Sequence, residues 1–203
     1  LVMAAVFWVA NRALKTDKET REAPPASIAV EPFAPEVEKI IRERMTLIEE
    51  LVRDPAIVAA VQKANEEHTS LSLETILQLD TRWRNTSGMD EFIGAFLTNE
   101  VAVKLLEFQE VHPSFAEIFV TDQYGLNVGQ TNKTTDYYQA DEEWWVGGYQ
   151  SGRGRSYYGP IEFDESAQAE AISIYVPVMD PNTNAAIGVA KAVVSIASIK
   201  LEL

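Results

Sequence analysis

The 203-residue chain contains no cysteine and only two histidines. The lack of cysteine excludes disulfides, thiolate zinc sites and cysteine nucleophiles. With two histidines, we expect neither a Ser-His-Asp triad nor a metal site built from several histidines. Basic residues are also scarce, because 17 Lys and Arg stand against 31 Asp and Glu, which gives a net charge of −14. We expect no nucleic-acid partner, since phosphate binding requires clustered Lys and Arg.

Motifs of common enzyme classes are missing as well. The chain has no P-loop, no G-x-S-x-G and no H-E-x-x-H, and its many carboxylates form no pair that marks a glycosidase. The stretch "DPNTNA" (180–185) resembles the start of an EF-hand loop. However, Ala185 replaces the required glycine and Lys191 stands at the position of the bidentate Glu, so we interpret it as a polar turn. We therefore expect no catalysis, no metal and no cofactor.

The first ten residues, "LVMAAVFWVA", are uniformly apolar. This run is shorter than the roughly 20 residues that span a bilayer. We interpret residues 1–14 as the end of a transmembrane helix, with a signal-peptide remnant and a buried helix as the alternatives. Residues 15–35 are polar and rich in proline, which predicts a connector that leaves the membrane.

Residues 36–112 predict a helical N-terminal part. In "EVEKIIRERMTLIEELV" apolar residues recur at helical spacing, which predicts one long amphipathic helix. Asp54-Pro55 predicts its end and the start of another helix, because Asp is a good N-cap and Pro is tolerated at the first helical position. Ser72 opens a further helix. Residues 90–109 predict two helical pieces that meet near Thr98-Asn99, and His112-Pro113 ends the helical part.

After Pro113 the hydrophobic period changes from 3.6 to 2, which predicts strands. The expected strands are "FAEIFVT", "LNVGQT", "SYYGPIEF", "AEAISIYVPV" and "AIGVAKAVVSI". A helix over 136–151 is expected between the second and third strands, with Asp136 and Gln139 at capping-box spacing. The predicted fold is α+β: a PAS-like, five-stranded antiparallel sheet with one inserted helix, preceded by the long N-terminal helix and the helical segment.

The segment "DYYQADEEWWVGGY" (136–149) combines five aromatic rings with four carboxylates. An acidic catalytic site, a sugar-binding surface and a helix that covers a ligand pocket are three interpretations of this composition. Asp141, Glu142 and Glu143 fall in the first turn of the expected helix, where negative charge favours the helix dipole. The acids therefore have a structural explanation, and the rings remain available to cover a pocket.

Residues 113–203 resemble a Cache (PDC) sensor domain. The resemblance rests on "FAEIFVTDQYGLNVGQTNKTTDYYQADEEWW" and on "GPIEFDESAQAEAISIYVPVMDPNTNAAIGVAKAVVSI". It implies a periplasmic or extracellular sensor, anchored in a bacterial inner membrane, that serves a histidine kinase, a chemoreceptor or a cyclic-dinucleotide enzyme. It also implies that an amino acid or a small carboxylate binds between the sheet and the inserted helix. A homodimer is expected, and a ligand-free dimerisation module of a receptor is the alternative.

Strand alternation separates the two faces of the expected sheet. In "AISIYVPV" we assign the aliphatic side chains to the N-terminal helices and Ser173 and Tyr175 to the pocket. Lys191 lies on the pocket face of the last strand, where it would pair with a ligand carboxylate or a nearby Asp, or would extend to water. The resemblance implies that Asp164 contacts a ligand amine, and a turn-forming Asp is the alternative.

Four aromatic residues complete the predicted ligand site. Trp145 and Tyr149 lie one helical turn apart, so they either pack as core or form a wall of the pocket. Tyr157 and Tyr158 alternate, so that only one of them faces the pocket, and we select Tyr158. The predicted ligand-binding residues are Tyr138, Trp145, Tyr149, Tyr158, Asp164, Ser173, Tyr175 and Lys191.

Overall fold

The computed structural model describes residues 33–166 and 168–203 of the chain. The expected membrane helix (1–14) and nearly all of the expected connector (15–35) lie outside these residues. Within the described part, no helix is both long enough and apolar enough to cross a membrane.

Within residues 33–114, five helices precede the first strand, and the starts of these helices follow the capping signals in the sequence. Asp54, Ser72 and Asn99 each accept a hydrogen bond from a backbone N–H of the helix that follows. These side chains satisfy N–H groups that have no partner within a helix. The break near Thr98-Asn99 is confirmed. The helices are α1 (Pro35–Leu51), α2 (Pro55–His68), α3 (Leu73–Asn85), α4 (Glu91–Thr98) and α5 (Glu100–Val111).

The second half of the chain forms one antiparallel sheet with the strand order β2-β1-β5-β4-β3. The α+β fold with a five-stranded sheet and an inserted helix is therefore confirmed. The remaining elements are β1 (Phe115–Thr121), β2 (Asn127–Gln130), α6 (Glu143–Tyr149), the 3-10 turn η1 (Gln150–Gly152), β3 (Tyr157–Asp164), β4 (Ala169–Met179), β5 (Ala186–Ser195) and α7 (Ile196–Lys200).

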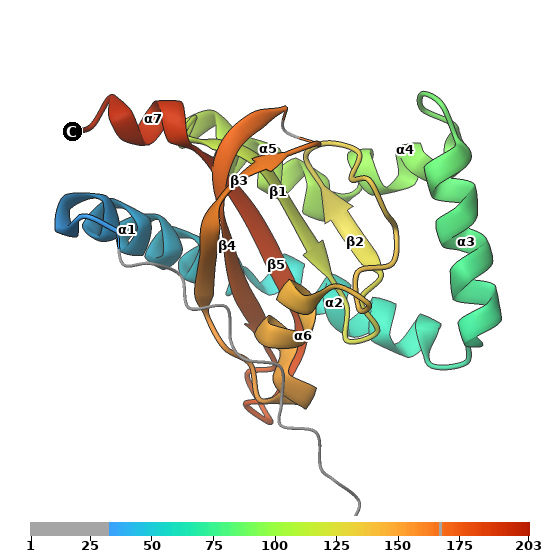
Figure 1. Cartoon of the computed structure of the whole chain (residues 1–203). Helices are drawn as coiled ribbons and strands as arrows, with labels where there is room; N and C mark the ends of the chain where they lie inside the picture. The colour runs from blue at the N-terminus through green and yellow to red at the C-terminus, as the bar shows by residue number, and fades with distance from the viewer. Residues whose placement is uncertain (1–32, 167) are drawn as a thin grey trace, which may run out of the picture.

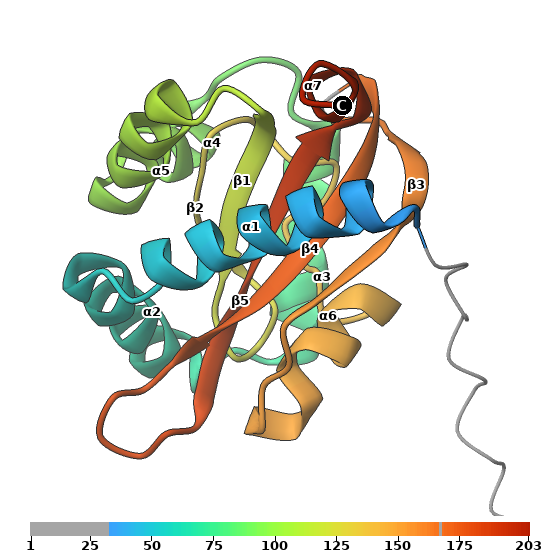
Figure 2. The same cartoon turned by 90° about the vertical axis from the view of Figure 1, so that its left-hand side faces the viewer.

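The sheet is covered on both faces. Helix α1 crosses one face, with α2 and α5 beside it, and α6 covers the other face (Figures 1 and 2). The aliphatic side chains of β4 and the alanines Ala190 and Ala192 of β5 form the core against α1, as the alternation predicts. The apolar face of α1 is buried in this core through Ile40, Ile41 and Ile48.

A second apolar cluster fixes the segment between β2 and α6. Trp83 of α3 is fully buried, and its indole N–H donates to the carbonyl of Thr134 at 2.8 Å. The Asp80 carboxylate accepts hydrogen bonds from the backbone N–H groups of Tyr137 and Tyr138, at 2.9 and 3.2 Å. Helix α3 therefore holds residues 134–138 in place at the β2 edge of the sheet (Figure 1).

The predicted start of the inserted helix, at residue 136 of the expected range 136–151, was wrong. Helix α6 begins at Glu143, and Tyr138 instead forms an isolated antiparallel bridge with Leu126. The expected capping box is also wrong, because the Gln139 amide donates to the carbonyl of Asp136 within a loop. The backbone of 136–139 bonds to Asp80, Gly125 and Asn127, and these long-range partners replace helical hydrogen bonds.

Helices α1 and α7 are tied together by one side chain. The guanidinium of Arg44 donates to the hydroxyl of Ser114 at 2.9 Å and forms an ion pair with Glu202, just after α7. The two helices lie near each other in both views (Figures 1 and 2).

Gly188 of β5 allows β1 to approach closely, and we expect any larger residue to separate the two strands. A Cβ at this position would lie 2.0 Å from the Thr121 carbonyl oxygen, which belongs to rigid backbone. Gly188→Ala should therefore lower the free energy of unfolding by at least about 2 kcal/mol. Gly94→Ala in α4 is the control, since its Cβ meets only the Met89 side chain at 3.6 Å. It should raise stability by up to about 1 kcal/mol. Urea denaturation compares the two, and equal stability of the Gly188 variant and the wild type would contradict the proposed contact.

Candidate functional site

The predicted site lies on the face of the sheet that α6 covers. Helix α6 reaches this face closely because two of its residues lack side chains. A Cβ at Gly147 would lie 2.7 Å from the Tyr157 hydroxyl, and a Cβ at Gly148 would lie 3.0 Å from Val189. The Tyr157 hydroxyl also donates to the carbonyl of Trp144 at 2.7 Å. The "VGGY" end of α6 is thus fixed against β3 and β5.

Strand register aligns one residue from each strand across this face. Gln130 of β2 is opposite Phe119 of β1, and Phe119 is opposite Lys191 of β5. Lys191 is opposite Tyr175 of β4, which in turn is opposite Tyr157 of β3. Because opposite residues of an antiparallel pair point to the same side, these five side chains form one row on the face of the sheet that α6 packs against.

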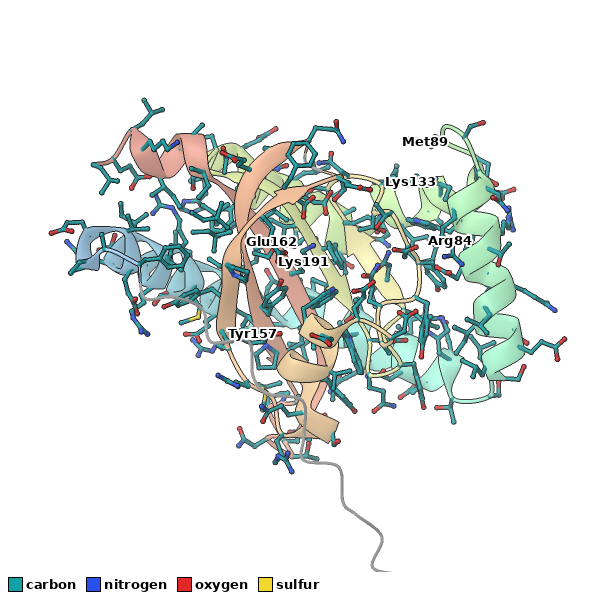
Figure 3. The ribbon with its side chains drawn as sticks, in the orientation of Figure 1. Arg84, Met89, Lys133, Tyr157, Glu162 and Lys191 are labelled. Atoms are coloured by element: carbon teal, nitrogen blue, oxygen red, sulfur yellow. The ribbon has the colours of Figure 1, made fainter. Side chains whose placement is uncertain are left out.

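An ion pair lies at the centre of the row. The Lys191 ammonium is 3.1 Å from a carboxylate oxygen of Asp164, and both side chains are largely buried, with 17% and 10% of their surface exposed. Figure 3 shows Lys191 near the middle of the sheet and Tyr157 close to α6. Of the two alternatives for Lys191, the structure shows the one in which it pairs with a nearby Asp.

A second carboxylate adjoins this pair. Glu117 of β1 is fully buried, and its Oε1 lies 2.9 Å from the Ser166 hydroxyl. The same hydroxyl lies 2.7 Å from Asp164. One hydroxyl proton cannot serve both carboxylates at once, so a protonated Glu117 that donates to Ser166 satisfies the chain of groups. Burial raises the pKa of the Glu117 carboxyl to about 7, and the charge of Asp164 acts in the same direction.

Aromatic rings enclose the charged groups. Trp144 stacks on Tyr175, with centroids 5.2 Å apart, and meets Phe119 edge to face at 5.8 Å. The Lys191 ammonium lies 5.9 Å from the ring centroids of both Phe119 and Trp144, a distance at which cation–π attraction acts. Tyr157 closes the other end, 4.7 Å from Tyr175. The result is a polar centre with aromatic walls.

The structure places four of the eight predicted residues on this face. Asp164, Tyr175 and Lys191 lie in the polar centre, and Ser173 lies two residues before Tyr175 on the same side of β4. Trp145 and Tyr149 belong to α6, and their rings stack on each other. The buried Trp145 indole N–H donates to the Thr121 hydroxyl at 2.9 Å. Their position favours the core interpretation. Tyr138 packs instead against the Trp83 cluster.

The choice of Tyr158 over Tyr157 was wrong. Tyr158 is opposite Ile174, whose side chain belongs to the core with α1. The ring centroids of Tyr158 and Phe33 are 6.0 Å apart. Tyr157 is the residue that faces the polar centre. The register between β3 and β4 decides this, and the register shift between Tyr158 and Ile161 was not readable from the sequence.

Sequence reasoning missed several residues of this centre: Glu117, Phe119, Gln130, Trp144 and Ser166. A usable signal existed for Glu117. It is the one charged residue in "FAEIFVT", an otherwise apolar strand, and a charge in such a strand calls for a partner. Gln130 sits at the end of a short strand and carries no comparable signal.

Two hollows of the described surface lie away from this centre, one along α1 between Phe33 and Thr46 and one along α3 between Leu73 and Thr81. Because Lys191 and Asp164 pair with each other at 3.1 Å, a ligand that binds either charge has to separate them.

Burial of Glu117 makes stability depend on pH. Its carboxyl has a pKa of about 7 in the folded chain, against 4.5 for the free group, so between these values the folded chain holds more protons than the unfolded chain. The free energy of unfolding should therefore fall as pH rises from 4.5 to 7, by up to about 3 kcal/mol for this one group. Glu117→Gln should remove that part of the dependence. Urea denaturation of both proteins at pH 5 and pH 8 measures it, and identical pH dependence would show that Glu117 is not buried as described.

No family model matches the chain, and no curated protein matches its sequence. Several solved structures match the chain at low identity and at TM-scores below 0.5. The ligand-binding domain of the Campylobacter jejuni chemoreceptor Tlp3 with 4-methylisoleucine has a TM-score of 0.40 and 11% identity, over 83% of this chain and 63% of that one. The ligand-binding domain of the Pseudomonas aeruginosa PAO1 amino acid chemoreceptor PctB with L-Arg has a TM-score of 0.41 and 14% identity. The match covers 81% of this chain and 53% of that one.

The E. coli DcuS sensor domain has a TM-score of 0.38 and 15% identity, over 64% of this chain and 92% of that one. The match to the Tlp3 and PctB domains covers less than two thirds of the length of each of those two domains. All three solved structures are ligand-binding or sensor domains of receptors, and all three match this chain at a TM-score below 0.5.

Proposed function

We propose that this chain is the extracytoplasmic sensing part of a membrane-anchored bacterial receptor, and that it binds a small ligand between the sheet and α6. The observation that carries the proposal is the buried Lys191–Asp164 pair within aromatic walls. A buried ion pair contributes little to stability, because the desolvation of both charges offsets their attraction. A pair of this kind, beside the protonatable Glu117, has the character of a binding site.

The pair selects the chemical class of the ligand. In the present conformation each charge neutralises the other at 3.1 Å. A ligand that carries both a carboxylate and an ammonium group can separate the pair and still leave each charge with a partner. The carboxylate would face Lys191 and the ammonium would face Asp164, while Trp144 and Tyr175 provide apolar walls. An amino acid fits this arrangement, and a plain carboxylate would use Lys191 alone.

Strand β5 is the proposed route of the signal. Lys191 faces the site, while its neighbours Ala190 and Ala192 face the core against α1. A ligand that binds one position of β5 more tightly than another would shift the conformational equilibrium, and the shift would reach α1 through these alanines. We propose that the receptor acts as a homodimer at the bacterial inner membrane. A kinase, a chemotaxis module and a cyclic-dinucleotide enzyme all remain candidate outputs.

The ligand-free dimerisation module is the rival function. It requires an apolar stripe on α1 that is available to a second copy. The structure buries Ile40, Ile41 and Ile48 against the sheet of the same chain instead. This arrangement favours the ligand-binding function.

A thermal-shift screen of the chain against amino acids, small carboxylates, amines and sugars tests the proposal. A ligand at 100 times its dissociation constant should stabilise the fold by about 2.7 kcal/mol, which raises the melting temperature by several degrees. Silence across all four classes, with a folded dimer in solution, would favour the dimerisation module.

Lys191→Ala and Asp164→Ala should each weaken binding of the best ligand at least tenfold, because each removes one ionic partner. Each variant is compared with its own ligand-free melting temperature, since loss of one partner also lowers stability. Lys63→Ala on the exposed surface of α2 is the control and should bind as the wild type does. Unchanged affinity in both site variants would refute the assignment of this site.

A further inference from the structure

Four buried polar side-chain atoms have no hydrogen-bond partner within residues 33–166 and 168–203. They are Oε2 of Glu117, Oδ1 of Asn127 and both the Nε2 and Oε1 atoms of Gln130. All three side chains are fully buried. Native proteins satisfy nearly all buried polar groups, because each unsatisfied one costs about 1–3 kcal/mol. Their occurrence together therefore requires an explanation.

The three residues lie on one face of two neighbouring strands. Gln130 is opposite Phe119, and Asn127 is opposite Thr121, two residues further along β1. Glu117 precedes Phe119 by two residues and so shares its face, diagonally across from Gln130, at about 7–8 Å between Cα atoms. This is the face that carries Lys191, Trp144 and the Asp164 carboxylate. Glu117 lies on β1, directly beside the strand of Lys191, and Asn127 and Gln130 lie one strand further away, on β2.

Gln130 differs from every other group in this centre, because its amide is neutral and lacks partners for both its donor and its acceptor. Its backbone lies two strand spacings from Lys191, roughly 10 Å. Asn127, by contrast, already donates to Thr134 and to the carbonyl of Asp136. A ligand group that forms hydrogen bonds would therefore satisfy the most unpaired atoms at Gln130, with Glu117 beside it.

We propose that Gln130 and Glu117 form a subsite for a neutral group that both donates and accepts hydrogen bonds, such as a primary carboxamide. This inference rests on the proposed function and extends it: the ion pair holds the zwitterionic end of an amino acid, and the subsite holds the amide at the far end of its side chain. The carboxamide N–H groups donate to Gln130 Oε1 and Glu117 Oε2, and its oxygen accepts from Gln130 Nε2.

Other side-chain ends fit this subsite less well. A carboxylate lacks a donor and would approach Asp164 and an ionised Glu117, which repel it. A thioether or alkyl end leaves the Gln130 amide buried and unpaired, and sites built for hydrogen bonding reject analogues that cannot form those bonds. An ammonium end has no acceptor for Gln130 Nε2. The subsite therefore discriminates between ligands of nearly equal size.

Isothermal titration of the chain with L-glutamine, L-glutamate and L-methionine tests the subsite. Wild type should bind glutamine at least tenfold more tightly than either of the others. Gln130→Met removes the amide at nearly constant volume, so the ratio of methionine to glutamine affinity should rise at least tenfold. The ligand-free variant should be as stable as wild type or more stable, because an unpaired amide is removed. Gln78→Met on the exposed side of α3 is the matched control and should change neither ratio nor stability.

Glu117→Gln is the second variant, which keeps the test decisive if Gln130→Met fails to fold. At pH 8, where Glu117 is ionised in wild type, the variant should improve glutamate binding relative to glutamine at least tenfold. Unchanged ligand ratios in the folded variants, with binding still abolished by Lys191→Ala, would overturn the subsite while the proposed function stands. A wild type that binds none of the three amino acids also overturns the subsite, and the broader screen then decides the proposed function. A large loss of stability in Gln130→Met with unchanged ratios would likewise overturn the subsite, because the amide would then have a structural role.

Discussion

Both faces of the five-stranded sheet have to be buried, and the rest of the structure depends on this constraint. On one face the solution is a continuous aliphatic core beneath α1, α2 and α5. On the other face the described part of the chain places a short helix and a loop, and large rings cover the sheet there instead of a second aliphatic layer. A face of this kind has room for Lys191, Asp164 and Glu117 because aromatic side chains tolerate charged neighbours that an aliphatic layer would exclude.

The covering of the second face depends on distant parts of the chain. Asp80 and Trp83 of α3 hold the backbone of residues 134–138. Gly147 and Gly148 then bring α6 down onto β3 and β5. The loop and the helix are thus anchored at both ends, while the part between them lies over the polar centre. Any opening of the site has to bend this anchored segment or release one of its two ends.

Local chemistry in the sequence predicted much of the fold. The caps at Asp54 and Ser72 and the break near Asn99 follow from side chains that satisfy their own neighbours, and the alternation in β4 follows from burial on one side. The features of the fold that depend on partners distant in the sequence were not predictable. The start of α6 is set by the bonds of residues 136–139 to α3 and to the loop after β1, and the orientation of Tyr157 and Tyr158 is set by the register with β4.

The same division holds for the site. Lys191 was identified because a charge in an apolar strand is visible in the sequence. Asp164 was identified because the resemblance to sensor domains implies a ligand contact at this position. Their pairing with each other, across 27 positions, is a product of the fold. Gln130 was not identifiable, because an amide at the end of a short strand is ordinary until the surrounding strands show that nothing in the described chain reaches it.

The Arg44 side chain has a mechanical consequence. Because it joins α1 to Ser114 and to Glu202, the long helix and the end of the described chain cannot slide past each other without breaking a charged contact. This link favours a tilt or a rotation of both segments together over a piston stroke of α1 alone. A displacement of β5 at the sheet centre would leave the domain as a change of angle, amplified along the length of α1.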